Sequence, residues 1–292
     1  MTRQAMYAAM RARSRECAPR LPGLVTLFHL PPPLRDLPFV QRWVGGIGTR
    51  LIAGRAELTL PNGDILCCGP TRRERHVALK TYLHVGYLGQ YLRRHVPQPG
   101  DVVLDLGANL GCFMLPVARL VGETGHVYCV ECVPNNAADL RRTVAANQLD
   151  NVTVIEQAAG ATQGTTRMSL HQKSSQHSAF YDSGGETAEV STTTVDDLVA
   201  AQGLTRVDFI KIDVEGMEAD VLRGAARTLR QHRPYVCMAG YHRPEDATEL
   251  PRVLCEIEPA YHCEGDYPAW AEFDFHAWCE EPAAAGSEAP GQ

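Results

Sequence analysis

The sequence lacks an uninterrupted apolar run long enough to cross a membrane. Its apolar segment near the start, LPGLVTLFHLPPPL at residues 21–34, is broken by Pro22, Gly23 and three consecutive prolines. The residues before it are rich in Ala and Arg, which is typical of a frayed helix or of an amphipathic targeting segment. We therefore predict a soluble, cytoplasmic protein without a transmembrane segment, with organelle targeting as the alternative.

An excess of basic residues is also missing. The chain has 28 Lys and Arg against 34 Asp and Glu, which gives a formal net charge of −6. Proteins that coat nucleic acid usually carry a strong basic excess, so we expect no nucleic-acid partner. The hydrophobic fraction of 45% is sufficient for a folded core, and no internal repeat is visible.

The cysteines follow neither a disulfide framework nor a zinc motif. The chain has 10 cysteines, several of them inside apolar runs, where free cysteine behaves as a small hydrophobic residue. Cys129 and Cys132 form a C-x-x-C pair, but no second pair or Cys/His set follows at ligand spacing. This usage favours a reducing compartment and predicts no metal at the pair.

Three segments of different character follow one another. Residues 1–98 form an N-terminal arm with hairpin and helical patterns, residues 99–281 alternate between strands and helices, and residues 282–292 have the composition of a disordered tail. Within the middle segment, short apolar runs such as DVVLDLG, GHVYCVE and VDFIKIDVEG are each followed by a helical pattern. This alternation is typical of an α/β fold with a mostly parallel sheet covered by helices on both faces.

Local patterns predict further elements. Ala56–Cys68 reads as a hairpin around a Pro-Asn-Gly-Asp turn, and His76–Val96 has the spacing of one helix. The polar stretch Gln163–Glu189 predicts a short hairpin with a mobile loop. Thr194, three residues before an acid, is typical of a helix N-cap.

A glycine turn follows the first of the apolar runs. In DVVLDLGANLGC, Gly107 and Gly111 border a turn that we expect to present backbone N–H groups at the sheet's carboxyl edge, where a ligand can approach closely. The spacing is neither G-x-G-x-x-G nor a phosphate loop, which disfavours a nicotinamide dehydrogenase and a nucleotide triphosphate. A tight turn without any ligand is the alternative.

An acid at the end of the next run narrows the choice of ligand. Glu131 lies 24 residues after Gly107, where a carboxylate can accept hydrogen bonds from both hydroxyls of a ribose. A ribose site without phosphate chemistry favours adenosine that carries a small zwitterionic group, as in S-adenosylmethionine. Asp105 could face the ammonium group of that ligand, or could be a solvated turn carboxylate.

Three distinctive blocks lie between about Pro99 and Tyr241. They are DVVLDLGANLGC, TTTVDDL and, most distinctive of all, VDFIKIDVEGMEADVLRGAARTLRQHRP. With these blocks the chain resembles the FkbM family of S-adenosylmethionine-dependent methyltransferases. The resemblance implies a class I methyltransferase (Rossmann-like) fold, whose seven-stranded sheet ends in a reversed hairpin, and S-adenosylhomocysteine as product. It also implies a set of cofactor-binding residues, namely Asp105, Gly107, Asn109, Gly111 and Glu131, with Gln157 near the adenine.

Two positions depart from the family pattern. Cys132 follows Glu131 where the family commonly has proline, and Pro116 lies in the helix after the glycine turn. A proline beyond the first turn removes a backbone hydrogen bond, so we predict a kink there.

The block KIDVEG carries the candidate catalytic acids. Asp213 and Glu215 follow a strand, and Lys211 on the same face is expected to pair with them or lower the pKa of each. His242 follows the next strand and has a side chain suited to a general base. We predict Asp213, His242 and Glu215 as catalytic residues; a helix cap, an ion pair and an ordinary turn histidine are the alternatives.

Together these features predict a methyltransferase that acts on a hydroxyl group of a small molecule, such as a sugar, a lipid or a secondary metabolite. A divalent metal at Asp213, Glu215 and His242 is compatible with the ligand types but is not predicted. Methylation of nitrogen, or of a protein or peptide side chain, is the second hypothesis. A non-catalytic nucleoside-binding regulatory protein is the third, and the acceptor and the oligomeric state stay open.

Overall fold

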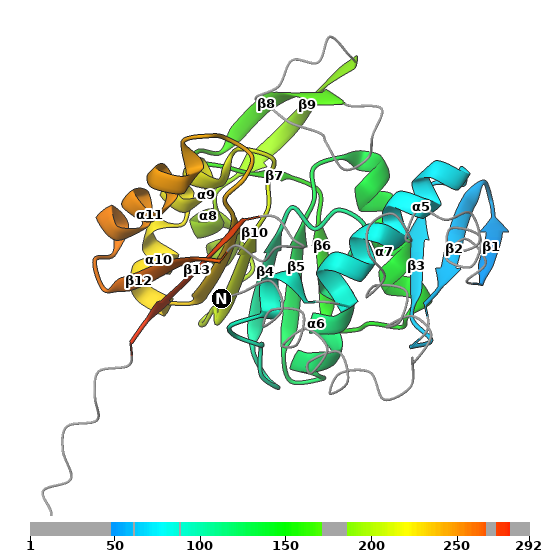
Figure 1. Ribbon diagram of the computed structural model, residues 1–292, viewed down its shortest axis with the longest axis horizontal. Coiled ribbons are helices and arrows are strands. Elements are labelled where there is room, and N and C mark those ends of the chain that lie inside the picture. Colours follow the sequence, from blue (N-terminus) through cyan, green and yellow to red (C-terminus); the bar gives the residue numbers. More distant parts are fainter. Residues whose placement is uncertain (1–47, 61, 88, 171–185, 267–272, 281–292) are drawn as a thin grey trace, which may run out of the picture.

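The computed structural model describes residues 48–60, 62–87, 89–170, 186–266 and 273–280. Its centre is a seven-stranded sheet with helices on both faces (Figure 1). In spatial order the strands are β12 (Tyr261–Asp266), β13 (Asp274–Cys279), β11 (Tyr235–Ala239), β10 (Phe209–Ile212), β4 (Val102–Leu106), β5 (His126–Val130) and β6 (Val152–Ile155). The pairs from β11 to β6 are parallel, while β13 is antiparallel to both of its neighbours. The predicted parallel sheet with a reversed final hairpin is confirmed.

Successive side chains of the central strands enter two separate cores. Val103 and Phe209 pack on one face, whereas their neighbours Leu104 and Ile210 pack on the other. The first face is covered by α5 (Arg72–Thr81), α6 (Met114–Val121) and α7 (Pro134–Ala146), and the second by α8 (Val195–Ala201), α9 (Glu218–Gly224), α10 (Ala226–His232) and α11 (Asp246–Ile257). In the described residues, no helix has the length and apolarity that a membrane span requires.

A small antiparallel sheet precedes the core. It consists of β1 (Thr49–Ile52), β2 (Arg55–Thr59) and β3 (Ile65–Cys68), so the hairpin predicted over 56–68 is confirmed. The Cys67 N–H donates to Thr143 Oγ1 of α7 at 3.0 Å, which ties this sheet to the core. The rest of the predicted arm, before residue 48, and the predicted tail, 282–292, lie outside the described residues.

The helix predicted over His76–Val96 is wrong in extent, because α5 ends at Thr81. The chain then forms a π-helical turn, η1 (Tyr82–Tyr87), and a 3-10 turn, η2 (Gln90–Leu92). Gly89 between them is left-handed, with φ +60°, and a left-handed residue ends a helix. The turn η2 then lies against the carboxyl edge of the central sheet.

The polar stretch after β6 forms a hairpin, as predicted. β8 (Gly164–Leu170) pairs antiparallel with β9 (Glu186–Thr193), and β7 (Ala158–Ala159) pairs parallel with β9. The loop between β8 and β9 lies outside the described residues. The predicted cap is also confirmed, because Thr194 Oγ1 accepts a hydrogen bond from the Asp197 N–H at 3.0 Å.

The predicted kink at Pro116 is wrong. The helix α6 begins at Met114, so Pro116 is its third residue. N–H groups in the first turn have no acceptor within the helix, and a proline there removes no helical hydrogen bond.

The glycine turn after β4 is shaped by the packing of the chain itself. Gly107 has φ +79°, and a Cβ there would lie 1.8 Å from the carbonyl oxygen of Asp213. A Cβ on Gly111, which has φ +89°, would lie 2.7 Å from Leu140 Cδ1. The Gly107 N–H donates to the Val130 carbonyl at 2.9 Å. The close packing of protein atoms thus explains why glycine is required at these two positions, and Gly107 also lines the cavity described below.

Two fully buried titratable groups lie on β13. Burial raises the pKa of Asp274 to about 7, although Arg93 and Gln90 oppose this rise. Burial also lowers the pKa of His276 to about 4, and the charge of Arg93 adds to the effect. Folding therefore favours the protonated carboxyl of Asp274 and the neutral ring of His276.

These two shifts act on stability in opposite directions. Between pH 3.8 and about 7 the folded state binds more protons at Asp274, so stability falls as pH rises. Between about 4 and 6.5 the unfolded state binds more protons at His276, so stability rises with pH. Over their common range the two contributions largely offset each other.

We expect Gly107→Ala to destabilise the fold more than Gly203→Ala. Both glycines have positive φ, but a Cβ on Gly203 meets no atom within 4 Å. The control should lose about 1 kcal/mol from its backbone conformation, and Gly107→Ala at least about 2 kcal/mol because Asp213 must move. Urea unfolding measures both losses, and equal losses would contradict the proposed close approach.

We also expect Asp274→Asn to change how stability depends on pH. Relative to the wild type, its free energy of unfolding should rise by about 2 kcal/mol between pH 5 and 7, because only the wild type must ionise the buried carboxyl. Urea unfolding at the two pH values tests this, with Asp220→Asn on α9 as a partly exposed control. A difference from the wild type that stays constant over this range would argue against the shift.

Candidate active site

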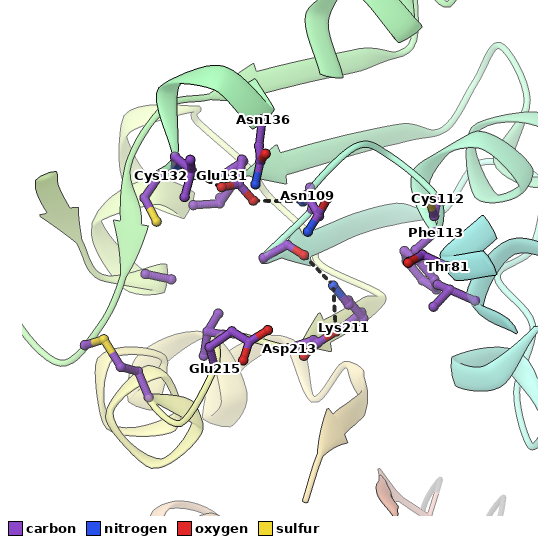
Figure 2. A pocket seen from close by; sticks show the side chains of 18 of the residues that line it. Thr81, Asn109, Cys112, Phe113, Glu131, Cys132, Asn136, Lys211, Asp213 and Glu215 are labelled. Carbon is purple, nitrogen blue, oxygen red and sulfur yellow. Dashed lines mark hydrogen bonds and ion pairs between the residues drawn. The ribbon is translucent and has the colours of Figure 1, made fainter. Parts of the chain in front are cut away.

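A cavity of about 850 Å³ opens at the carboxyl ends of β4, β5 and β10 (Figure 2). The order of the strands reverses between β4 and β10, and ligands of open α/β sheets bind at such a switch point. The predicted site residues among its lining are Gly107, Asn109, Glu131, Gln157, Asp213, Glu215 and His242. Asp105 and Gly111 are not part of the lining.

Glu131 is held by the backbone around it. Its Oε2 accepts the Asn109 N–H and its Oε1 accepts the Val133 N–H, each at 2.8 Å, and 6% of the residue is exposed. Burial raises the pKa of Glu131, while the two backbone hydrogen bonds oppose the rise. The Asn136 side chain also hydrogen-bonds this carboxylate, which therefore keeps capacity for one further donor, such as a hydroxyl in the cavity.

Lys211 pairs mainly with Asp105, its direct neighbour in the register of β10 and β4. Its Nζ lies 3.0 Å from Asp105 Oδ1 and donates to the Gly107 carbonyl at 2.7 Å. The predicted contact with Asp213 is longer, at 4.0 Å. Burial lowers the pKa of Lys211, but the surrounding acids outweigh this effect and raise the pKa overall. Burial raises the pKa of Asp105, although the charge of Lys211 opposes this rise.

Asp213 is oriented from two sides. The hydroxyl of Tyr91, a buried residue of η2, donates to Asp213 Oδ2 at 2.9 Å. The Tyr241 hydroxyl lies 3.5 Å from Asp213 Oδ1, and His242 Nε2 lies 3.6 Å from the same oxygen. Asp213 Oδ1 therefore faces the two side chains that follow β11.

His242 lies among three carboxylates. Its Nδ1 is 2.8 Å from Glu218 Oε1, and its Nε2 is 3.6 Å from both Asp213 Oδ1 and Glu215 Oε2. Burial lowers the pKa of His242, but the hydrogen bond to Glu218 and the nearby negative charges outweigh it and raise the pKa to about 9. At neutral pH the ring thus keeps its proton in this arrangement, which argues against the predicted role of His242 as a free base.

Sequence reasoning missed Tyr91, Glu218 and Tyr241 as members of the site. Glu218 lies inside the block KIDVEGMEAD quoted above, but the sequence of this block does not indicate that Glu218 belongs to the site. Tyr91 belongs to the segment predicted as a regular helix. Nothing in its local sequence indicates that it reaches an acid 122 positions later in the chain.

Comparisons with known proteins agree with this geometry. The family model "Methyltransferase FkbM domain" matches residues 105–275, which is more than half of the 292 residues. The chain is 31% identical over 170 residues to 31-O-demethyl-FK506 methyltransferase FkbM of Streptomyces tacrolimicus, covering 46% of this chain and 63% of that protein. It is 25% identical over 195 residues to 2-O-methyltransferase NoeI of Sinorhizobium fredii, covering 60% and 78%.

A solved structure has a similar fold. The methyltransferase FkbM from Methylobacillus flagellatus KT matches with a TM-score of 0.50 and 20% identity, over 68% of this chain and 48% of that one. The chain thus spans 63% of the Streptomyces relative and about half of the solved structure. The predicted class I methyltransferase fold is confirmed by the strand order and by this likeness. With a family model that matches residues 105–275, the chain belongs to the FkbM methyltransferase family.

Proposed function

We propose that the protein transfers a methyl group from S-adenosylmethionine to a hydroxyl group of a small molecule. The proposal rests on one observation: two groups of residues with different chemistry line the same cavity, and we call them its two halves. Glu131 and the turn at Gly107 form one half, and Asp213 and His242 form the other. The first half suits a nucleoside, and the second suits a polar group that gives up a proton.

The cofactor half fits S-adenosylmethionine by its donors and acceptors. The Glu131 carboxylate would bind a ribose hydroxyl, Asn109 and the glycine turn would lie along the methionine end, and Gln157 would lie near the adenine. Because Asp105 is buried behind the lining, we assign it an indirect role through Lys211 and the Gly107 carbonyl. The bound cofactor supplies a methyl carbon on a positively charged sulfur, which is a good leaving group.

The reaction is an in-line displacement on that methyl carbon. The cofactor, when bound, would supply this carbon to the acceptor oxygen and would keep the electron pair of the broken carbon–sulfur bond on its sulfur. The acceptor's hydroxyl proton passes to Asp213 Oδ1 and then to solvent. This is the carboxylate oxygen that lies next to the Tyr241 hydroxyl. Tyr91 holds the other oxygen, so the accepting atom has a fixed direction.

The rest of the cavity wall has both apolar and polar side chains, which suits a small molecule that carries hydroxyl groups. It is formed by Val77, Lys80, Thr81 and His84 of α5 and η1, and by Met168 of β8. The names of two relatives, a 2-O-methyltransferase and a methyltransferase of 31-O-demethyl-FK506, add support for oxygen as the acceptor atom.

Incubation with methyl-labelled S-adenosylmethionine and a panel of hydroxylated sugars, lipids and secondary metabolites tests the proposal. We expect label on an oxygen of at least one compound, located by mass spectrometry and NMR. Label on amines alone would favour nitrogen methylation. Cofactor binding without transfer to any acceptor would favour a regulatory nucleoside-binding protein.

We expect Glu131→Gln to weaken S-adenosylmethionine binding by roughly 10- to 100-fold, because a charge-assisted hydrogen bond to the ribose is lost. Isothermal titration calorimetry gives the dissociation constant. Glu256→Gln on the exposed side of α11 makes the same chemical change outside the cavity and should bind normally. An unaltered affinity in Glu131→Gln would remove the ribose assignment.

Asp213→Asn should reduce kcat for an oxygen acceptor by at least about 100-fold, because the amide cannot take the hydroxyl proton. Cofactor affinity should stay near that of the wild type. Steady-state kinetics and calorimetry on the same preparation separate the two effects, with Asp220→Asn as the control. A parallel loss of both would show that Asp213 acts on cofactor binding or on the fold.

A further inference from the structure

Side-chain hydrogen bonds hold the turn η2 against the hairpin of β12 and β13, which lies at one edge of the central sheet (Figure 1). Gln90, the first residue of η2, donates from Nε2 to Asp274 Oδ1 at 3.2 Å, with Oδ2 at 3.3 Å. Arg93, which follows η2, donates from Nη2 to Asp274 Oδ2 at 3.1 Å and from Nε to Asp266 Oδ2 at 2.9 Å. Both ends of the turn are therefore tied to acids of one hairpin.

We propose that Asp274 is a positioning residue, which holds η2 so that the Tyr91 hydroxyl stays on Asp213. Tyr91 is the middle residue of η2 and donates to Asp213 Oδ2 at 2.9 Å. Asp274 is not part of the cavity lining, so its effect on the reaction passes through the turn. This inference rests on the proposed function, because Asp213 is the acid to which we assign the acceptor's proton.

The turn η2 does not set its own position. It has three residues, no side-chain hydrogen bond from the described residues caps its start, and Gly89 before it is left-handed, with φ +60°. So short a 3-10 turn has poor hydrogen-bond geometry and is not stable by itself. Burial supplies part of the order, since Tyr91 packs edge to face on Phe113 with the ring centroids 6.1 Å apart. Apolar packing is non-directional, so the direction of the Tyr91 hydroxyl depends on the hydrogen bonds at the ends of the turn.

The two acids that hold the turn are unfavourable for the hairpin alone. Asp266 and Asp274 are direct partners in the register of β12 and β13, and like charges directly opposite each other are destabilising. Asp274 is also fully buried, which is unfavourable for a carboxylate unless it is paired and hydrogen-bonded. Apolar side chains would join these strands without that penalty. Because both acids bind Arg93, the position of η2 explains why they are there.

Nuclear magnetic resonance of tyrosine labelled with ¹³C at Cζ tests this link without cofactor or acceptor. The Cζ shift responds to the hydrogen bond of the hydroxyl, and the Tyr91 signal is identified by its loss in Tyr91→Phe. The spectra are recorded at pH 8, where Asp274, with a pKa of about 7, is mostly ionised. We expect Asp274→Ala to move the Tyr91 signal, because the turn is released and the hydroxyl leaves Asp213.

Asp64 offers a matched control. It is also a buried acid that binds an amide and an arginine, in this case Asn62 and Arg119. It lies in the turn between β2 and β3 and is not part of the cavity lining. Asp64→Ala should therefore lower stability but leave the Tyr91 signal in place.

Kinetics with the compound labelled in the acceptor panel test the effect on the reaction. Asp274→Ala and Tyr91→Phe should each lower kcat by about 10-fold, because Asp213 loses its fixed direction. The double variant should lose about as much as either single variant, since both remove the same hydrogen bond. S-adenosylmethionine affinity should stay near that of the wild type. Asp274→Asn, which keeps an oxygen for Gln90, should recover most of kcat.

Two outcomes would overturn the proposal: a Tyr91 signal that stays in place in folded Asp274→Ala, or losses that multiply to about 100-fold in the double variant, as independent structural effects would. If Asp274→Ala does not fold, Gln90→Met removes the same contact from the other side and must move the Tyr91 signal. A chain in which the signal moves but no compound of the panel is methylated would remove the proposed function and leave the link between Asp274 and Tyr91 intact.

Discussion

The buried ion pair between Lys211 and Asp105 fixes the geometry on which the whole site depends. It joins β10 to β4 at the point where the strand order reverses, and the same ammonium binds the carbonyl of Gly107. Buried ion pairs add little stability over apolar residues of similar size, but removing one partner leaves an uncompensated charge. Here the pair lies where the turn at Gly107 meets the Asp213 backbone, and it adds to the backbone hydrogen bonds that already join the two strand ends.

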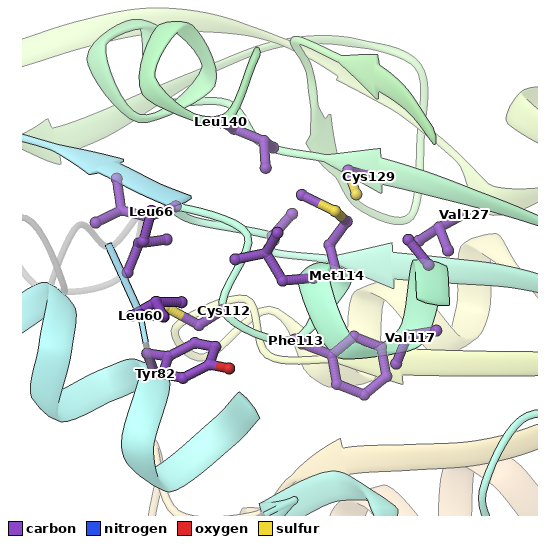
Figure 3. Close-up of a cluster of buried hydrophobic side chains, with 14 of the residues drawn as sticks. Leu60, Leu66, Tyr82, Cys112, Phe113, Met114, Val117, Val127, Cys129 and Leu140 are labelled. Carbon is purple, nitrogen blue, oxygen red and sulfur yellow. The ribbon is translucent and has the colours of Figure 1, made fainter. Parts of the chain in front are cut away.

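From this pair, charges of alternating sign continue across the carboxyl edge of the sheet. Asp105, Lys211, Asp213, His242 and Glu218 follow one another at 3.0, 4.0, 3.6 and 2.8 Å. The acid proposed to take the proton thus lies between two cationic side chains and accepts hydrogen bonds from tyrosines on both sides. A change at either end of this row alters the electrostatic environment of the reaction, even where the changed residue touches no ligand. The hydrophobic core around α6 (Figure 3) packs against β4 and β10, the strands that carry Asp105 and Lys211.

Much of the fold could be predicted because its signals are local. Continuous apolar strands, the turn in 56–68 and the cap at Thr194 each depend on a few neighbouring residues. The sequence shows less where distant segments decide. The predicted pairing of Lys211 with Asp213 is present at 4.0 Å, but the closer partner Asp105 depends on a strand register that cannot be read from one strand. Gly107 lines the cavity, but its local sequence does not show that a Cβ there would also meet a carbonyl more than a hundred positions later.

The two halves of the cavity differ in how they are encoded, and this explains why the sequence indicated Asp213, Glu215 and His242 of the second half but not their contacts with Tyr91, Glu218 and Tyr241. The cofactor half comes from one strand–turn–helix segment and the end of the next strand, so Gly107 and Glu131 carry it in contiguous sequence. The acceptor half is assembled from η2, the turn after β10 and the loop after β11, which supply Tyr91, Asp213 and His242. No spacing rule links those segments. An acceptor can therefore change through substitutions in any of them while the cofactor half stays the same.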